Sequence, residues 1–442
     1  MTSEGPRAIR VAWISAFVIC AALLSAPWRG HVDDLDAQIY LVVVRNMVRD
    51  RTWLDLRYLP SFLPVFREHL PFGLWPAAAA IRLLGEWAIN PLYATMMLGA
   101  IGTSGLIARR LGGDAAGVAA VILLGTCESI WQYGGRLLLE PPLLLFATGA
   151  AGAALANLWP AAAALGAVAT LIKGPFGLLP LACVCAVNGR NWRAWAALLA
   201  AVAPVAVFLA LDPSGGWRDG YLRNQLLVSA SGARTDGVSA WWFLPAVIAG
   251  RFWPGLPFLL AGLWRARRDA RIRPLAFACL LMAALLCVPQ RKWGNQAYVA
   301  FPLLAALAGV GAAPLLRKMG HPRWLAPALA AAAVVFSVSG AGALVLRPPC
   351  AFSTALAGAL RSIPRGAMVS IESPQGIWPA VAQLAAEGDV RPSPAQGGSD
   401  CARFAATRGV PVPAGWQKIA SAPDWSILRR SAPAPRCPAE DR

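Results

Sequence analysis

The sequence predicts an all-α polytopic membrane protein followed by a small α/β domain. Of the 442 residues, 57% are hydrophobic and 14% are charged, whereas an ordinary soluble domain has roughly 25% charged residues. Apolar runs recur from Val11 to about Leu346, with short polar or basic gaps between them. After these runs Pro, Ser and Gln become frequent. We therefore expect one transmembrane body over residues 1–346 and a soluble domain over 347–430.

Basic residues predict how this body is oriented in the membrane. The 40 Lys and Arg residues exceed the 22 Asp and Glu residues, which gives a formal net charge of +18. Much of the excess falls in short gaps between apolar runs: Arg109-Arg110, Arg190 with Arg193, Arg265 to Arg273, and Arg317-Lys318 with Arg323. The positive-inside rule places such clusters in the cytoplasm. No nucleic-acid-binding motif accompanies them, so no nucleic-acid partner is expected.

The first apolar run and the loop after it set the topology. Residues 11–27 follow two arginines and lack a signal-peptide cleavage pattern, so they are predicted to be an uncleaved first span that enters from the cytoplasm. The loop 28–71 is then exoplasmic, and residues 39–48 within it are predicted to form a helix in the membrane interface. The apolar segment 72–84 falls short of the ~20 residues that a span needs and is expected to be interfacial or re-entrant.

Further apolar runs are predicted to be spans. They lie near residues 91–108, 114–129, 140–158, 160–172, 175–188, 194–211, 241–263, 274–289, 297–313 and 324–346. With the first run they make about eleven transmembrane helices, in a range of about 10 to 13, because several runs are short. This arrangement puts the basic clusters in the cytoplasm and the C-terminal domain outside, whereas counting 72–84 as a span would put the clusters outside.

The exoplasmic domain carries its own pattern of short elements. The tail after it, residues 431–442, is expected to be disordered. Helices are predicted over 351–360 and 377–386, and strands over 367–372, 401–405 and 425–428.

Acidic residues open the predicted exoplasmic loop. Asp33, Asp34 and Asp36 come soon after the first span. Ionisable residues beside a bilayer are costly to bury, so those that do not set topology are functional candidates. A carboxylate at this place can act as a general base toward a hydroxyl group. The alternative is that the acidic loop only keeps this segment out of the bilayer.

A carboxylate and an imidazole stand side by side later in the same loop. Glu68 and His69, together with Asp34 or Asp36, have the ligand types that bind Zn²⁺, Mn²⁺ or Mg²⁺. The sequence therefore predicts a candidate divalent metal site. The alternative is a solvated glutamate beside a surface histidine.

Charged residues also stand at predicted exoplasmic ends of spans. Glu140 precedes two prolines at a helix start, where a carboxylate either takes part in function or only complements the helix dipole. Lys173 and Lys292 fall at helix ends in a chain that otherwise uses Arg as its cation. Such lysines suit a lipid-linked phosphate, and the alternative is that they snorkel to the interface.

Short motifs follow one another along residues 11–310. They are Asp36 with Tyr40, Arg45 and Met47; Glu68-His69-Leu70-Pro71 with Trp75; Arg136 with Glu140; Lys173-Gly174-Pro175; Arg251 with Pro254 and Pro257; and Lys292 with Tyr298 and Pro302. In this order they resemble the GT-C superfamily of membrane glycosyltransferases, within it the family of protein O-mannosyltransferases and lipid A aminoarabinose transferases. This sequence departs from that family at Ala37, where the family has Glu, and at His69, where it has Lys.

The resemblance implies a glycosyltransferase that moves a sugar from a polyprenyl phosphate to an exoplasmic acceptor with inversion. It implies a GT-C fold in the bacterial inner membrane, with the active site and the C-terminal domain on the periplasmic side. The implied roles are Asp36, Asp34 and Glu140 in catalysis, Lys173, Lys292, Arg251 and Tyr298 at the donor phosphate, and Tyr40, Arg45 and Arg136 in support.

Two other functions fit the same hydropathy. A transporter or flippase of lipid-linked saccharides would carry polar groups near the middle of broken spans, whereas here they gather at one predicted face. The departures at Ala37 and His69 also leave open a non-catalytic member of the family. The position of the polar groups favours the transferase.

Overall fold

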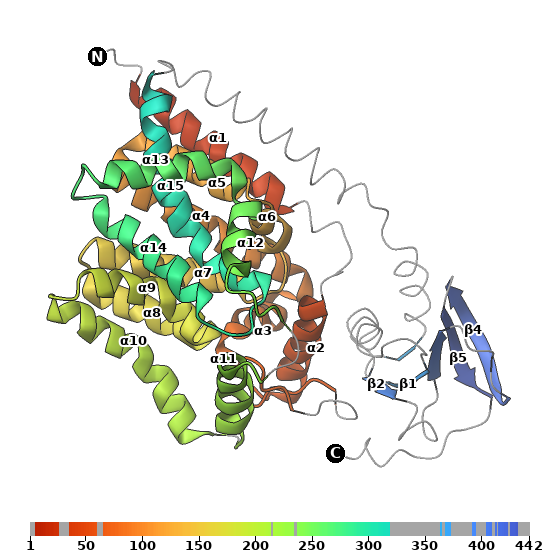
Figure 1. Ribbon diagram of the computed structural model, residues 1–442. Coiled ribbons are helices and arrows are strands. Elements are labelled where there is room, and N and C mark those ends of the chain that lie inside the picture. Colours follow the sequence, from red (N-terminus) through yellow and green to blue (C-terminus); the bar gives the residue numbers. More distant parts are fainter. Residues whose placement is uncertain are drawn as a thin grey trace. The chain divides into compact units, whose positions relative to one another are not determined.

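The computed structural model describes most of the helical region and the strands of the C-terminal region (Figure 1). The described residues are 5–25, 35–59, 65–213, 215–233, 237–318, 363–364, 367–372, 391–394, 404–408, 412, 414–422 and 425–431. They form two compact units. The first holds the described residues of 1–27, 67–76 and 84–344, and the second holds those of 28–66, 77–83 and 345–442.

The first unit is a bundle of helices that correspond to the predicted apolar runs. The predicted span 324–346 lies outside the described residues. The helices are α1 (Gly5–Ser25), α4 (Ile89–Gly112), α5 (Asp114–Gly125), α6 (Glu128–Gly134), α7 (Glu140–Leu155), α8 (Trp159–Lys173), α9 (Pro175–Val187), α10 (Trp192–Leu211), α11 (Val228–Ser231), α12 (Phe243–Arg251), α13 (Leu256–Ala266), α14 (Arg273–Cys287) and α15 (Phe301–Lys318). Shorter helical turns are η2 (Pro71–Gly73), η3 (Glu86–Ala88), η4 (Arg218–Leu227), η5 (Trp253–Gly255) and η6 (Gly294–Ala300).

Two predicted spans are interrupted in the structure. The run 241–263, predicted as one helix, bends by 79° between α12 and α13. Pro254 and Pro257 cause this break because proline has no N–H to donate and clashes with the preceding turn. The run 114–129 ends as α5 at Gly125, and α6 starts separately at Glu128.

Among the described residues, three helices are long and apolar enough to cross a membrane by themselves. These are Glu86–Gly112, Trp192–Leu211 and Gly294–Lys318, and the bent pair α12 and α13 makes a fourth if it counts as one span. The other apolar helices are shorter, so the count of about eleven spans stays a prediction. Helix α3 (Trp75–Leu84) has only 10 residues, which agrees with the expectation that this segment does not span.

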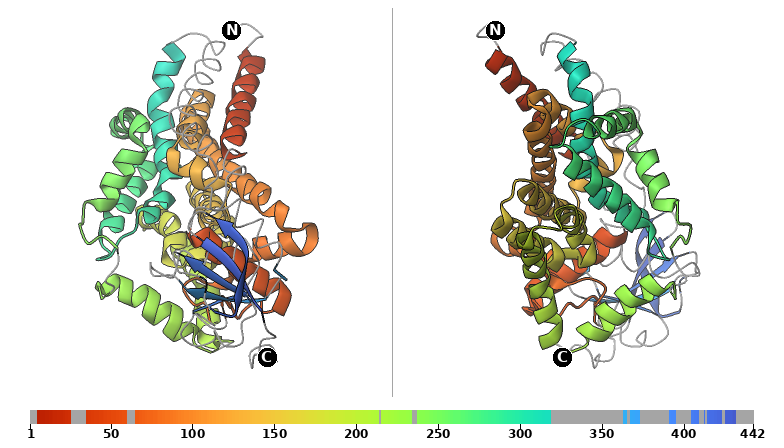
Figure 2. Two further views of the ribbon diagram at one scale, coloured as in Figure 1. Left: turned by 90° about the vertical axis from the view of Figure 1, so that its right-hand side faces the viewer. Right: turned by 60° about the vertical axis from the view of Figure 1, so that its left-hand side comes forward.

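Figure 2 shows the described helices from two further sides, and two hydrogen bonds identify helix ends that lie together. At one end, Arg265 donates a hydrogen bond from Nη1 to the carbonyl of Val310 at 2.5 Å, and Arg317 donates from Nη2 to the carbonyl of Gly112 at 3.3 Å. The C-terminal ends of α4 and α15 therefore meet there, and the C-terminal end of α13 contacts α15 at Val310, nearer its middle. We call this the basic end, since it carries the predicted cytoplasmic clusters; the other is the opposite end.

Exposed side chains on the first unit suit a bilayer. Tryptophans are exposed at the basic end (Trp192, Trp195 and Trp264) and at the opposite end (Trp87, Trp241, Trp242 and Trp253). Between these levels the exposed side chains include Leu106, Leu199, Val207, Leu260 and Leu280. Tryptophan prefers the membrane–water interface and aliphatic side chains prefer the hydrocarbon, so this is the surface of a membrane protein with transmembrane helices.

Small residues allow the helices of the core to pack backbone against backbone. Helix α15 is almost entirely buried and packs on α5 and α13. A Cβ atom added at Gly311 would overlap the carbonyl oxygen of Phe258, and one at Gly309 would overlap the carbonyl oxygen of Ala116. In a membrane such close approaches stabilise helix pairs through dispersion contacts.

Gly311→Ala is therefore expected to destabilise the protein by about 1–3 kcal/mol, because the backbones of α13 and α15 must separate to admit the methyl group. Thermal unfolding of the purified protein in detergent should show a lower midpoint for this variant. Gly250→Ala is the matched control, since nothing lies within 4 Å of a Cβ at this helical position. The control should be neutral or slightly stabilising. Equal midpoints for the two variants would contradict the packing argument.

The second unit contains helix α2 (Leu35–Asp50), which extends the helix predicted over 39–48 in both directions. Its buried Asn46 donates from Nδ2 to the carbonyl of Arg57 at 3.2 Å and to that of Tyr58 at 2.6 Å. The ring of Tyr40 meets that of Phe66 edge-on at 6.3 Å. These contacts tie the described part of the loop after α2 back to the helix.

A five-stranded sheet in the order β2-β1-β3-β5-β4 forms the C-terminal part of the second unit. β1 pairs in parallel with β2 and β3, whereas β5 pairs in antiparallel fashion with β3 and β4. The predicted helices 351–360 and 377–386 lie outside the described residues, as do residues 432–442. The strands are β1 (Met368–Glu372), β2 (Arg391–Pro394), β3 (Phe404–Arg408), β4 (Trp416–Ala422) and β5 (Trp425–Arg430).

The sequence predicted three of these strands and missed the two at the sheet edges. β1 and β5 agree with prediction, and β3 begins three residues later than the predicted 401–405. β2 contains Pro392 and Pro394, which suit only an edge strand because they cannot donate to a ladder. β4 has an irregular register between Lys418 and Ala420, which breaks the alternation that predicts a strand.

Candidate functional site

Two of the predicted site residues form a buried ion pair at the opposite end of the first unit. Glu140 is the first residue of α7 and Lys173 is the last residue of α8, and these two helices pack side by side (Figure 1). The Lys173 ammonium lies 2.6 Å from Glu140 Oε1, and the two side chains are 12% and 6% exposed. Each charge also complements its own helix dipole, so the capping and pairing roles coincide.

The turn after Lys173 is fixed by its glycine. Gly174 has a φ of +54°, which disfavours any residue with a side chain. A Cβ atom at Gly174 would overlap the hydroxyl of Tyr221, a buried residue of η4. The Lys-Gly-Pro motif therefore serves a local purpose: the glycine admits the tyrosine, and Pro175 begins α9.

A second ion pair joins α6 to the end of α12. Arg251 Nη1 lies 2.7 Å from Glu128 Oε2, and the side chains are 38% and 47% exposed. The thiol of Cys127 donates to the carbonyl of Arg251 at 3.5 Å. Arg251 was predicted from sequence but Glu128 was not, because it stands inside the run 114–129 that was taken as one span. Its charge at the end of an apolar run was the signal that could have found it.

Tyr298 lies near both ion pairs, Glu140–Lys173 and Glu128–Arg251. Its ring stacks on that of Tyr133 and on that of Phe301, with centroids 5.7 Å apart in both cases. It lies near Ser129 and within electrostatic range of Glu140 and Arg251. The tyrosine is largely buried in η6, which packs against α7, α9 and α12.

Lys292 is a buried cation close in sequence to η6. Its backbone exchanges hydrogen bonds with Val238, with distances of 2.9 and 3.0 Å. Its side chain is only 2% exposed and has no ion-pair or hydrogen-bond partner among the described residues. An anion that reaches the Lys292 ammonium would be stabilised by its charge, because most of the side chain is shielded from water.

Three other predicted site residues, Arg136, Glu68 and His69, lie in the first unit. Arg136 is half-buried, in the segment between α6 and α7. Glu68 is exposed and His69 half-buried in the first unit, just before η2. No group of three His, Cys, Asp or Glu side chains that could hold a metal occurs in the part of the chain that the structure describes.

The predicted first-loop residues belong to the second unit. Asp36 is exposed in the first turn of α2, whereas Tyr40 is buried and Arg45 half-buried on the same helix. Asp34 lies outside the described residues. Asp36 belongs to the second unit whereas Lys173 and Glu140 belong to the first, so their predicted juxtaposition stays a prediction.

Solved structures of glycosyltransferases resemble this chain over most of its length. ArnT (a lipid A aminoarabinose transferase) from Cupriavidus metallidurans bound to undecaprenyl phosphate aligns with a TM-score of 0.75 and 15% identity, covering 98% of this chain and 100% of that chain. The archaeal oligosaccharyltransferase AglB from Archaeoglobus fulgidus, in complex with an inhibitory peptide and a dolichol-phosphate, aligns with a TM-score of 0.54 and 13% identity, covering 89% of this chain and 69% of that chain. Another AglB structure, a complex with Zn and sulfate, has a TM-score of 0.54.

No protein-family model and no curated protein matches the sequence. The similarity to ArnT and AglB at low identity therefore identifies the fold. The chain shares the fold of these solved structures and, like ArnT, has a mostly helical body with a small C-terminal sheet. The predicted helical body with a small C-terminal sheet is thus confirmed, whereas the number of spans stays a prediction.

Proposed function

We propose that this protein transfers a sugar from a polyprenyl phosphate to an acceptor on the exoplasmic side of the membrane, with inversion at the anomeric carbon. The observation that carries the proposal is the gathering of Glu140, Lys173, Arg251 and Tyr298 at one end of a GT-C fold. The basic clusters lie at the other end of the helices. The positive-inside rule supports our proposal that the gathered residues face the periplasm of a bacterial inner membrane.

The cations serve the leaving group. A polyprenyl phosphate leaves as a stable anion, so the protein needs to stabilise negative charge and does not need a strong general acid. Lys292 and Arg251 are proposed to hold the phosphate, with the Tyr298 hydroxyl as a hydrogen-bond donor. Similar ligands are bound in the solved neighbours, undecaprenyl phosphate in ArnT and dolichol-phosphate in AglB.

Arg251 reaches a phosphate by exchanging partners. Its guanidinium contacts the half-exposed carboxylate of Glu128. A phosphate carries more negative charge than the Glu128 carboxylate, and its oxygens can bind the same N–H groups of the guanidinium. It can therefore compete with Glu128 for Arg251. Lys173 is held more firmly, because its pair with Glu140 is buried. Glu140 is therefore proposed to position Lys173, and Arg136 supports the segment that leads into α7.

Asp36 keeps the role of general base, aided by Asp34. The acceptor hydroxyl loses its proton to the carboxylate as its oxygen attacks the anomeric carbon, from the face opposite the phosphate. The C–O bond to the phosphate breaks, and the phosphate takes the electron pair. Tyr40 and Arg45 lie on the same helix as Asp36 and support it.

A divalent metal stays a prediction for this protein. Glu68 and His69 supply two ligands of suitable type, but a bound metal needs at least a third, and Asp34 lies outside the described residues. The proposed steps therefore use only side chains. Metal analysis of the purified protein, with Glu68→Gln as the comparison, tests the prediction directly.

Removal of the buried cation should weaken donor binding. Lys292→Met is expected to raise the dissociation constant for undecaprenyl phosphate at least about tenfold, because a charge-assisted hydrogen bond contributes roughly 1.5–3 kcal/mol. Lys318→Met, which removes the same charge at the basic end, should leave it unchanged. Binding to the purified protein is the measurement, and equal affinities for wild type and Lys292→Met would remove Lys292 from the phosphate site.

Transfer itself is tested in membranes that contain the protein, with radiolabelled polyprenyl-phosphate sugars and envelope acceptors. Appearance of label in an acceptor, with loss from the lipid, supports the proposed activity. Label that crosses the bilayer while still attached to the lipid would instead identify the protein as a transporter. Binding of undecaprenyl phosphate without either event would favour a non-catalytic member of the superfamily.

A further inference from the structure

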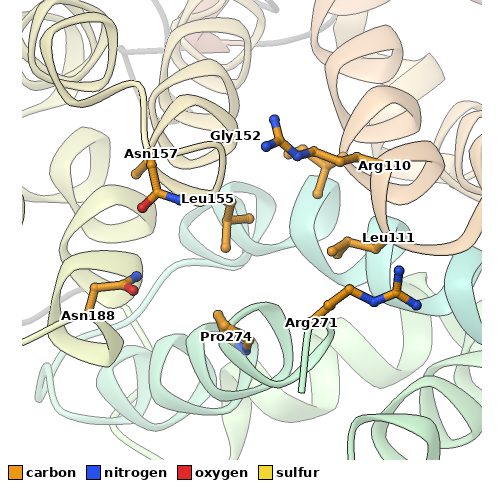
Figure 3. A pocket seen from close by; sticks show the side chains of 10 residues that line it. Arg110, Leu111, Gly152, Leu155, Asn157, Asn188, Arg271 and Pro274 are labelled. Carbon is orange, nitrogen blue, oxygen red and sulfur yellow. The ribbon is translucent and has the colours of Figure 1, made fainter. Parts of the chain in front are cut away.

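A cavity of about 130 Å³ opens at the basic end of the first unit (Figure 3). Its lining includes two arginines and two asparagines, with aliphatic side chains between them. A water molecule needs roughly 10–15 Å³ of such space, so this cavity admits a group as large as a phosphate ester. We call it the basic cavity and define it by Arg110, Leu111, Leu155, Asn157, Asn188 and Arg271.

The basic cavity is separate from the proposed transfer site. Glu140 begins α7, and Leu155 ends the same helix. A helix of 16 residues is about 24 Å long, so the two places lie at opposite ends of α7. What binds here therefore does not depend on the proposed function.

The polar groups of the basic cavity are mostly hydrogen-bond donors. Figure 3 shows the arginines on one side and the asparagines on the other. No acidic residue lines the cavity. Arg271 is bound to Asp269 through two side-chain hydrogen bonds, which lower the pKa of that carboxyl, so Asp269 stays ionised and offsets one charge.

Arg110 supplies the remaining positive charge. Its neighbour Arg109 lies 2.6 Å from Asp114, and Arg273 donates to the carbonyls of Ala266 and Arg267. Arg110, in contrast, has no hydrogen-bond or ion-pair partner among the described residues. Its guanidinium offers a planar fork of N–H groups that matches two oxygens of a phosphate.

The asparagines can add further donors. Asn157 has a φ of +61°, a left-handed conformation that asparagine tolerates, and this ends α7 beside the cavity. The last carbonyls of α7 already accept backbone hydrogen bonds, including Leu158 N to Ala153 O at 2.8 Å. The side-chain N–H groups of Asn157 are therefore not needed to cap these carbonyls. Asn188 uses one N–H on the carbonyl of Val184 and keeps the other.

The surroundings indicate a lipid as the source of the phosphate. Trp192 and Trp264 are exposed at this end, and Arg267 and Arg268 lie over the Trp264 ring at 5.5 and 5.2 Å. Exposed indoles beside cations are typical of the headgroup level of a membrane. Basic pockets between helices on the cytoplasmic side bind anionic headgroups. Leu111 and Leu155 in the lining suit the apolar part of such a molecule.

We propose that the basic cavity binds the phosphate of an anionic phospholipid, with Arg110 as its main charged contact. The site faces the leaflet that the sequence predicts to be cytoplasmic. A lipid held between the ends of α4, α7, α9 and α14 would tie these helices together.

The experiment uses the full-length protein, purified in detergent and washed free of lipid. The midpoint of thermal unfolding is followed during titration with phosphatidylglycerol, phosphatidylcholine or inorganic phosphate. Phosphatidylglycerol is expected to raise the midpoint at lower concentration than the other two. In Arg110→Gln the apparent dissociation constant for phosphatidylglycerol should rise about tenfold, which corresponds to about 1.4 kcal/mol.

Matched variants keep the test specific. Arg193→Gln removes an exposed arginine at the same end but outside the cavity and should respond to phosphatidylglycerol like wild type. Asn157→Ala should lower the affinity for phosphatidylglycerol by a smaller factor, and it does so without changing the net charge of the cavity. An unchanged response of Arg110→Gln to phosphatidylglycerol would overturn the proposal. Equal effects of inorganic phosphate and phosphatidylglycerol on wild type would overturn the lipid as the source.

Discussion

Asp36→Asn is expected to lower the rate of sugar transfer by about 10²–10⁴-fold while the protein stays folded. Asparagine has nearly the same shape as aspartate but cannot accept the proton of the acceptor hydroxyl. Asp36 is exposed in the first turn of α2, where its charge also complements the helix dipole. Loss of that charge should cost about 0.3–1 kcal/mol of stability, too little to unfold the protein.

The measurement is release of label from a polyprenyl-phosphate sugar in a single turnover at saturating donor. Donor affinity should be unchanged in Asp36→Asn, because the base acts on the acceptor. Asp50→Asn is the matched control, since Asp50 is an exposed aspartate at the other end of the same helix. Full activity in a folded Asp36→Asn protein would exclude Asp36 as the base and direct attention to Asp34.

Breaking the buried ion pair is expected to have the largest effect on stability. Glu140→Ala leaves the Lys173 ammonium buried without its counterion, and Lys173→Met leaves the carboxylate in the same position. Each change should destabilise the protein by about 3–5 kcal/mol, because an unpaired buried charge is strongly unfavourable. Donor-dependent transfer should fall in both variants, since the Lys-Gly-Pro turn and the start of α7 lose their shared contact.

The stability of a double variant distinguishes the loss of the ion pair from the burial of a single unpaired charge. Glu140→Leu with Lys173→Met removes both charges and should be clearly more stable than either single change, since no buried charge remains. Asp219→Ala breaks the exposed pair of Arg223 and Asp219, 3.8 Å apart, and should change stability by less than about 1 kcal/mol. Additive effects of the two single changes at Glu140 and Lys173 would mean that the side chains are not coupled.

Much of the fold could be predicted from the sequence because its cause is local. An apolar run of a given length defines a helix wherever it packs, and basic residues in the gaps define a direction. The helices α4, α8, α9, α10 and α14 therefore begin and end within a few residues of the predicted runs. Of the charged residues predicted to share one face, Glu140 and Lys173 do meet, whereas the gathering of the whole group stays a prediction.

The partners of those charged residues could not be predicted in the same way. Lys173 and Glu140 are 33 positions apart in the chain, and only the packing of α7 on α8 brings them to 2.6 Å. Glu128 looked like part of a span until the turn at Thr126 and Cys127 separated it from α5. Its partner Arg251 ends α12, just before the bend of 79° that divides the predicted span 241–263.

The sequence by itself determined the class of fold, a helical membrane body with a small terminal sheet, and it predicted a direction in the membrane from the arginines. Only the tertiary structure decided that Lys173 is neutralised, that Lys292 is buried without a described partner, and that Arg110 lines a cavity. Hydrophobicity and charge are properties of single residues and can be read directly from the sequence. An ion pair or a cavity belongs to residues from distant segments, so it exists only after those segments have packed.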